Sequence, residues 1–145
     1  MADLGGLKTV ADWPKARPKL EKEIASYLGK FPRERADLQI KTMDESVRGR
    51  IIRRRVNYFV DEWERVSAWL FIPEDHRDEL PAILCCHDKT PQGKDEPAGI
   101  DGDVNLAFAH HYADLGYVTL APDSVVAGER VATGAEPYDT KAYYK

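Results

Sequence analysis

The chain has 145 residues and a net charge of −4, and 43% of its residues are hydrophobic. This content is enough for a packed core, and the acidic balance gives nucleic-acid binding no support. The two cysteines, Cys85 and Cys86, are neighbours, which excludes a disulfide framework and fits a reducing, cytoplasmic compartment. No signal peptide and no apolar run of roughly 18 residues is visible, so we expect no membrane partner.

Residues 1–35 predict a helical lead segment. Asp12 can cap a helix, and Pro14 lies near its first turn, where a missing N–H costs little. Apolar residues then repeat at helical spacing as far as Leu28, and Gly29 ends the pattern. We interpret this segment as an amphipathic packing helix that carries no chemistry.

Strand patterns follow the lead helix. Residues 38–43 indicate a first short strand, and two longer runs cover residues 50–60 and 65–73. A polar turn joins the two runs, which predicts an antiparallel hairpin, and a charged loop follows over residues 74–80. Five arginines gather on this hairpin: Arg48, Arg50, Arg53, Arg54 and Arg55. They could bind phosphate, but we favour the solvated face of an edge hairpin, paired with nearby acids.

The next segment predicts a strand–helix–strand unit. The apolar run Ala82–Cys86 has the length and composition of a strand buried on both faces. Apolar residues recur at helical spacing over residues 106–115, and Gly116 closes the helix. A second buried strand covers residues 117–121. Two such strands are expected to be parallel, with a right-handed connection.

Chemistry in an open α/β sheet lies at the carboxyl ends of the strands. Here these ends carry His87-Asp88-Lys89 and Asp123-Ser124. We interpret His87 as a hydrogen-bonded pocket-wall residue rather than a general base, and Asp123 as a carboxylate that anchors a loop. His110 and His111 are adjacent on the predicted helix, where they point about 100° apart, so they are a poor metal pair.

Two segments carry a resemblance to a known family. Residues 87–99 read H-D-K-T-P-Q-G-K-D-E-P-A-G, and residues 116–130 contain G-Y-V-T-L-A-P-D and G-E-R. Together they resemble the α/β-hydrolase superfamily, and within it the branch of dienelactone hydrolases and acetyl-xylan-esterase-like enzymes. The resemblance runs from about Trp13 to the C-terminus. It implies an α/β fold with an incomplete α/β-hydrolase sheet, in which an antiparallel hairpin leads into a parallel βαβ unit.

The resemblance also implies where the catalytic groups belong. These enzymes need a nucleophile on a strand-to-helix elbow, usually G-x-S-x-G, followed by an acid and a histidine. No serine here has that setting, so residues 36–145 correspond to the first half of the domain, with the C-terminal half absent. The loop after the third family strand supplies one backbone donor of the oxyanion hole, here at Lys89 or Thr90. The expected pocket wall consists of His87, Asp88, Asp123, Glu129 and Arg130, the last two as a local ion pair.

The expected function of the complete enzyme is carboxylic-ester hydrolysis by a serine mechanism, with a small-molecule ester as substrate and no cofactor or metal. The alternative is a truncated or degenerate hydrolase-like domain that binds a small molecule or a partner subunit. A nucleotide-binding domain is a weaker rival, because no Gly-rich turn follows Leu84. The strand Ala82–Cys86 would lack a neighbour, so we expect self-association or a complementing chain.

Overall fold

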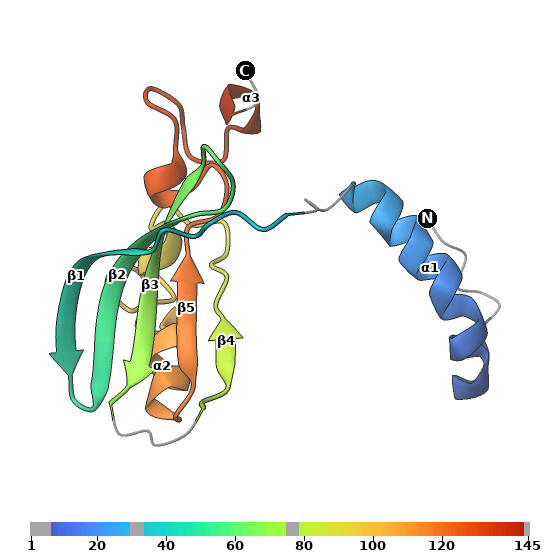
Figure 1. Cartoon of the computed structure of the whole chain (residues 1–145), viewed down its shortest axis with the longest axis horizontal. Coiled ribbons are helices and arrows are strands. Elements are labelled where there is room, and N and C mark those ends of the chain that lie inside the picture. Colours follow the sequence, from blue (N-terminus) through green and yellow to red (C-terminus); the bar gives the residue numbers. More distant parts are fainter. Residues whose placement is uncertain (1–6, 30–33, 75–78, 144–145) are drawn as a thin grey trace. The chain divides into compact units, whose positions relative to one another are not determined.

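The structure is a computed structural model, and it describes residues 7–29, 34–74 and 79–143 (Figure 1). The chain separates into two compact units, residues 1–35 and 36–145. In the first unit, a short 3-10 helix, η1 (Val10–Asp12), leads into α1 (Trp13–Leu28), so the predicted lead helix is confirmed. Asp12 lies at the N-cap of α1, but its carboxylate turns back and accepts a hydrogen bond from Thr9 N at 2.9 Å.

The second unit is built on one five-stranded sheet with the order β1-β2-β3-β5-β4. The strands are β1 (Lys41–Arg48), β2 (Ile51–Phe59), β3 (Arg65–Pro73), β4 (Ala82–Leu84) and β5 (Val118–Pro122). The first three form an antiparallel meander, β5 is antiparallel to β3, and β4 is parallel to β5. The sheet is therefore mostly antiparallel with one parallel pair.

The predicted hairpin is the pair β2–β3, and the structure confirms it. The predicted first strand lies later in the chain than expected, over Lys41–Arg48 instead of residues 38–43. Gln39 explains the difference, because its φ of +41° breaks the extended backbone between Leu38 and β1. The charged loop predicted over residues 74–80 falls partly on residues 75–78, which lie outside the described residues.

The predicted βαβ unit is also confirmed, with α2 (Phe108–Asp114) between the parallel strands β4 and β5. Gly116 closes this helix with a φ of +94°, a conformation that favours glycine. Two 3-10 helices, η2 (Gly93–Asp95) and η3 (Val104–Leu106), lie in the loop before α2. After β5 the chain forms η4 (Gly128–Arg130) and then α3 (Thr140–Tyr143).

The expectation that the strand Ala82–Cys86 is buried on both faces is wrong. Regular pairing stops at Leu84, and Leu84 is 62% exposed, whereas Cys85 is buried. The reason is that β4 lies at the edge of the sheet and α2 covers one face, over β3 and β5 (Figure 1).

The core lies between the sheet and α2. Its buried hydrophobic residues are Ile51, Trp69, Phe71, Cys85, Ala98, Ala109, Ala113 and Ala121. Small alanines on α2 let the helix approach the sheet closely, and the ring of Phe71 meets His110 edge-on at 6.0 Å. Within the described ranges, no helix is long and apolar enough to cross a membrane.

Candidate functional site

The loops that follow β4 and β5 meet through His87 and Ser124. The backbone N–H of Ser124 donates to His87 Nε2 at 2.9 Å, and His87 Nδ1 lies 2.7 Å from the carbonyl oxygen of Asp88. Because a backbone N–H can only donate, Nε2 must accept, and the ring proton therefore lies on Nδ1. His87 thus has both nitrogens bonded within the protein and cannot take the proton of the Ser124 hydroxyl in this arrangement.

Asp123 is a buried carboxylate that holds two loops at the end of β5. It accepts hydrogen bonds from Lys94 N at 2.9 Å, from Lys94 Nζ at 2.8 Å and from Glu129 N at 3.0 Å. Its side chain is fully buried. It therefore fixes η2 and η4 against the sheet, which is an anchoring role.

Lys94 balances this buried charge. Its ammonium also bonds Glu129 Oε1 at 2.7 Å, and Glu129 in turn accepts the Ser67 hydroxyl at 3.1 Å. Burial alone would lower the pKa of Lys94, but its bonds to the two carboxylates raise that pKa above the ordinary value. Burial would likewise raise the pKa of Glu129, and the ammonium of Lys94 lowers it. We call Ser67, Lys94, Asp123 and Glu129 the Asp123 cluster.

Two glycines leave room for the Asp123 carboxylate. Gly93 and Gly128 have φ values of +57° and +52°, and a Cβ atom on either would overlap Asp123 Oδ1. Both glycines are thus needed for their backbone conformation and for the close approach of the carboxylate.

The expected ion pair between Glu129 and Arg130 is wrong. Glu129 binds Lys94, and Arg130 binds Glu64, with Arg130 Nε 3.0 Å from Glu64 Oε1. Arg130 also donates to the carbonyl oxygen of Asp123 at 3.0 Å. In the 3-10 turn of η4 the two adjacent side chains diverge, so each finds a partner far away in the sequence.

The loop proposed as an oxyanion donor presents its two amides differently. Lys89 N–H donates to the side chain of Asp88 at 2.7 Å, which closes a local turn. Thr90 N–H donates to the carbonyl oxygen of Asp88 at 2.8 Å and to the phenolic oxygen of Tyr138 at 2.7 Å, and the Tyr138 hydroxyl donates to the carbonyl oxygen of Thr90 at 2.6 Å. The ammonium of Lys89 lies 5.5 Å from the centroid of the Tyr138 ring. The Thr90 donor is therefore shared between an oxygen of its own loop and an oxygen from outside the loop.

A nucleophile is not assembled at this place from the described residues. Burial raises the pKa of the Cys85 thiol to about 11, and the thiolate is the reactive form, so Cys85 is inert near neutral pH. The Ser67 hydroxyl is bonded to a carboxylate of the Asp123 cluster. Ser124 meets His87 through its backbone.

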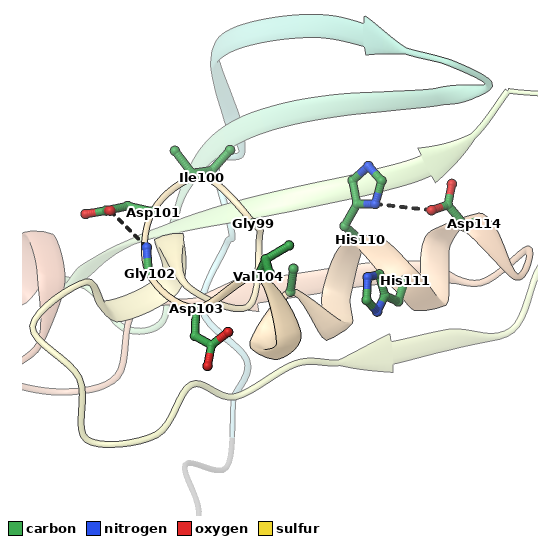
Figure 2. Close-up of a pocket in the computed structure, with 10 residues that line it drawn as sticks. Gly99, Ile100, Asp101, Gly102, Asp103, Val104, His110, His111 and Asp114 are labelled. Atoms are coloured by element: carbon green, nitrogen blue, oxygen red, sulfur yellow. Dashed lines mark hydrogen bonds and ion pairs between the residues drawn. The ribbon is translucent and has the colours of Figure 1, made fainter.

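A hollow of about 420 Å³ lies away from these strand ends, between the loop before α2 and the helix itself (Figure 2). It is lined by residues 99–104, Ala107, His110, His111 and Asp114. His110 Nδ1 lies 3.2 Å from Asp114 Oδ2, and His111 is exposed. Among the described residues, no group of His, Cys, Asp or Glu side chains could hold a metal ion.

Sequence reasoning missed Lys94 and Tyr138. Lys94 lies in a polar loop, and its partners Asp123 and Glu129 come 29 and 35 residues later. Tyr138 meets Thr90 across 48 residues and has an unusual φ of +66°. The local sequence signal was Gly93, beside Lys94. A glycine indicates that another group lies close to the backbone, but it does not predict that this group is the carboxylate of Asp123.

Comparison with known proteins gives a fold but no family. No protein-family model and no curated protein matches the chain. Its structure is similar to the crystal structure of a putative acetyl xylan esterase from Bacteroides fragilis, with a TM-score of 0.75 and 19% sequence identity. The similarity covers 94% of this chain and 38% of that protein. This chain therefore has a hydrolase-like fold, and it spans well under half the length of the protein that it resembles.

Proposed function

We propose that this chain forms the front part of a carboxylic-ester hydrolase of the α/β-hydrolase type, in the branch of dienelactone hydrolases and acetyl-xylan-esterase-like enzymes. The observation that carries the proposal is the Thr90 amide in the loop after β4, which donates to the Tyr138 hydroxyl oxygen at 2.7 Å and to the carbonyl oxygen of Asp88 at 2.8 Å. A substrate carbonyl oxygen that displaced the Tyr138 hydroxyl would share this donor with the carbonyl oxygen of Asp88. The likeness to a protein described as an acetyl xylan esterase supports an ester as the substrate class.

In this proposal the chain contributes binding and charge stabilisation. A backbone donor held by the fold favours the transition state because it already points at the charge that develops on the carbonyl oxygen. Thr90 is the favoured donor because one of its two acceptors, the Tyr138 hydroxyl, comes from outside the loop, and Lys89 is the second candidate because its amide is bonded to the Asp88 side chain within its own turn. His87, Asp88, Glu129 and Arg130 would form the pocket wall, and the fully buried Asp123 would hold that wall in place from behind. The serine, the acid and the late histidine would come from further residues, and the mechanism needs no cofactor.

The test uses the product of the whole reading frame that contains these residues. We expect this product to carry G-x-S-x-G after residue 145 and to hydrolyse p-nitrophenyl acetate. Thr90→Pro removes the donor N–H and should lower kcat by roughly 10²–10³, whereas Lys89→Ala keeps both amides and should retain most activity. Full kcat in folded Thr90→Pro and Lys89→Pro variants would place the donor elsewhere.

A non-catalytic hydrolase-like domain that binds a small molecule or a partner is the second candidate. It is favoured by the internal bonds that already satisfy both amides of the loop. The 145-residue chain alone should not hydrolyse p-nitrophenyl acetate above an inert-protein control under either hypothesis. Turnover that disappears in Ser124→Ala would contradict both, and a whole reading frame without an elbow serine would favour the binding domain.

A further inference from the structure

A second hollow, of about 460 Å³, lies on the α2 side of the sheet and is distinct from the strand ends. We call it the Arg53 hollow, and it is lined by Arg48, Arg53, Ala98, Gly99, Ile100 and His110. The hollow and the Asp123 cluster lie at different positions along β3. Arg53 of β2 lies opposite Phe71 of β3, whereas the backbone N–H of Asp123 bonds the carbonyl oxygen of Ser67, nearer the start of β3. The hollow therefore shares no lining residue with the Asp123 cluster or the loop of Thr90.

Arg53 is held in place by an aromatic ring. Its guanidinium carbon lies 5.1 Å from the centroid of the Trp69 ring. Trp69 is buried, and its indole N–H donates to Asp95 Oδ1 at 2.6 Å, so the ring itself is fixed. A guanidinium that stacks on a fixed aromatic face loses little further freedom when it binds a ligand.

One polar atom of a lining residue lacks a partner. Arg53 Nε is buried and has no hydrogen-bond partner in the part of the chain that the structure describes. Two other buried polar atoms of the described residues share this property, Ser46 Oγ and Asn57 Oδ1, and neither residue lines the hollow. Buried polar atoms in folded proteins are nearly always bonded, so Arg53 Nε is left for a water molecule or a ligand to complete.

The positive charge around the hollow favours a ligand with negative charge. Arg48 and Arg53 both line it, and none of its lining residues is a carboxylate. His110 uses Nδ1 to face Asp114, and Figure 2 shows its other ring nitrogen directed away from that carboxylate. Arg54, the next residue along β2, differs because it pairs with Glu45. The positive charge of the hollow is therefore not cancelled by its own walls.

We propose that the Arg53 hollow binds the phosphate group of a small molecule. Two guanidinium groups can offer several charge-assisted N–H donors to one tetrahedral dianion, and the arginine fork matches phosphate geometry. The volume is in the range of small-molecule sites and leaves room for an organic group beyond the phosphate. This site is independent of ester hydrolysis and stands whether or not that function holds.

The test titrates the 145-residue chain at constant ionic strength with inorganic phosphate, phenyl phosphate and acetate, and follows the backbone amide NMR signals of residues 98–100. We expect saturable shifts with both phosphates and none with acetate. Tighter binding of phenyl phosphate would identify an organic phosphate, and equal affinity would identify the free ion.

The matched variants are Arg53→Gln and Arg54→Gln, which remove one charge each from adjacent positions. Arg53→Gln should weaken binding by about tenfold or more, as expected for a lost charge-assisted hydrogen bond, and Arg54→Gln should leave it within about twofold. If Arg53→Gln does not fold, Arg48→Gln replaces it with the same expectation. Shifts that do not saturate, or an equal loss in the two variants, would overturn the proposal.

Discussion

The Asp123 cluster and the Arg53 hollow are both charged regions on one sheet, and they differ in how their charge is balanced. In the cluster the Lys94 ammonium and the Asp123 carboxylate lie 2.8 Å apart with almost no exposure, and each has further partners. In the hollow, Arg53 Nε has no partner among the described residues. A cluster that is closed in this way stabilises the fold, whereas an open one is available to a ligand.

The largest effect should follow from opening the closed cluster. Lys94→Met leaves the Asp123 carboxylate buried without its cation, so we expect a loss of roughly 3–5 kcal/mol in the free energy of unfolding. Arg54→Met removes a partly exposed pair and should cost no more than about 1 kcal/mol. Urea unfolding of both variants measures the difference. Equal losses would show that burial adds nothing to the Lys94–Asp123 pair.

The sequence allowed prediction of the elements but not of their charged partners. The lead helix, the hairpin and the βαβ unit follow from hydrophobic periodicities that each span a short stretch of sequence. The structure contains all three. The partner of Arg130 is Glu64, 66 residues away, and no local pattern encodes that choice. The expected pair with its neighbour Glu129 failed for the same reason, because Lys94 arrives from another loop.

The residue pattern predicted that His87 and Ser124 follow neighbouring parallel strands, although β4 ends at Leu84 and not at Cys86, and it left the chemistry of the site open. His87 and Ser124 do meet, as parallel neighbours should. The Ser124 contact is made by a backbone N–H, and the Thr90 amide is bonded to the Tyr138 hydroxyl. Both contacts depend on three-dimensional positions alone. Local sequence sets which residues are near the edge of the sheet, and packing decides which atoms face one another.

The Asp123 cluster can also be disrupted by a substitution at a backbone position, Gly128. Gly128→Ala and Gly134→Ala both place a side chain at positive φ, at a cost of about 1–2 kcal/mol. At Gly134 the new Cβ meets open space, whereas at Gly128 it would overlap Asp123 Oδ1. We therefore expect Gly128→Ala to cost about 1–3 kcal/mol more than Gly134→Ala. Thermal unfolding compares them, and equal costs would contradict the role of Gly128 as a spacer.

The pH dependence of the free energy of unfolding should also distinguish the buried Asp123 cluster from the exposed Arg54 pair, with a smaller effect. The pKa of Glu129 is lowered by folding, so its contribution is present above the unfolded value of about 4.3 and is lost as pH falls through the folded value. The pKa of Lys94 is raised, so its contribution is present below about 10.4 and is lost as pH rises through the folded value. Urea midpoints across pH should show a plateau between these limits. In Lys94→Met the alkaline decline should shrink, while Arg54→Gln should keep it; an unchanged decline in Lys94→Met would refute the assignment.

The smallest effect on unfolding, and the clearest on assembly, should come from the edge strand β4. It pairs with β5 on one side, no strand of the described chain pairs with it on the other, and Leu84 is 62% exposed. An open apolar edge offers backbone donors and acceptors to another chain, so we predict that the 145-residue chain associates through β4 with a second copy of itself. Sedimentation at several concentrations should show an average mass that rises with concentration.

Two lysine variants test whether β4 is the contact. Leu84→Lys places a charge on the edge and should reduce association without changing stability. Leu106 lies in η3 outside the sheet and is 42% exposed, so Leu106→Lys should leave association unchanged. A monomer at every concentration, or an equal effect of the two lysines, would show that β4 is not the contact.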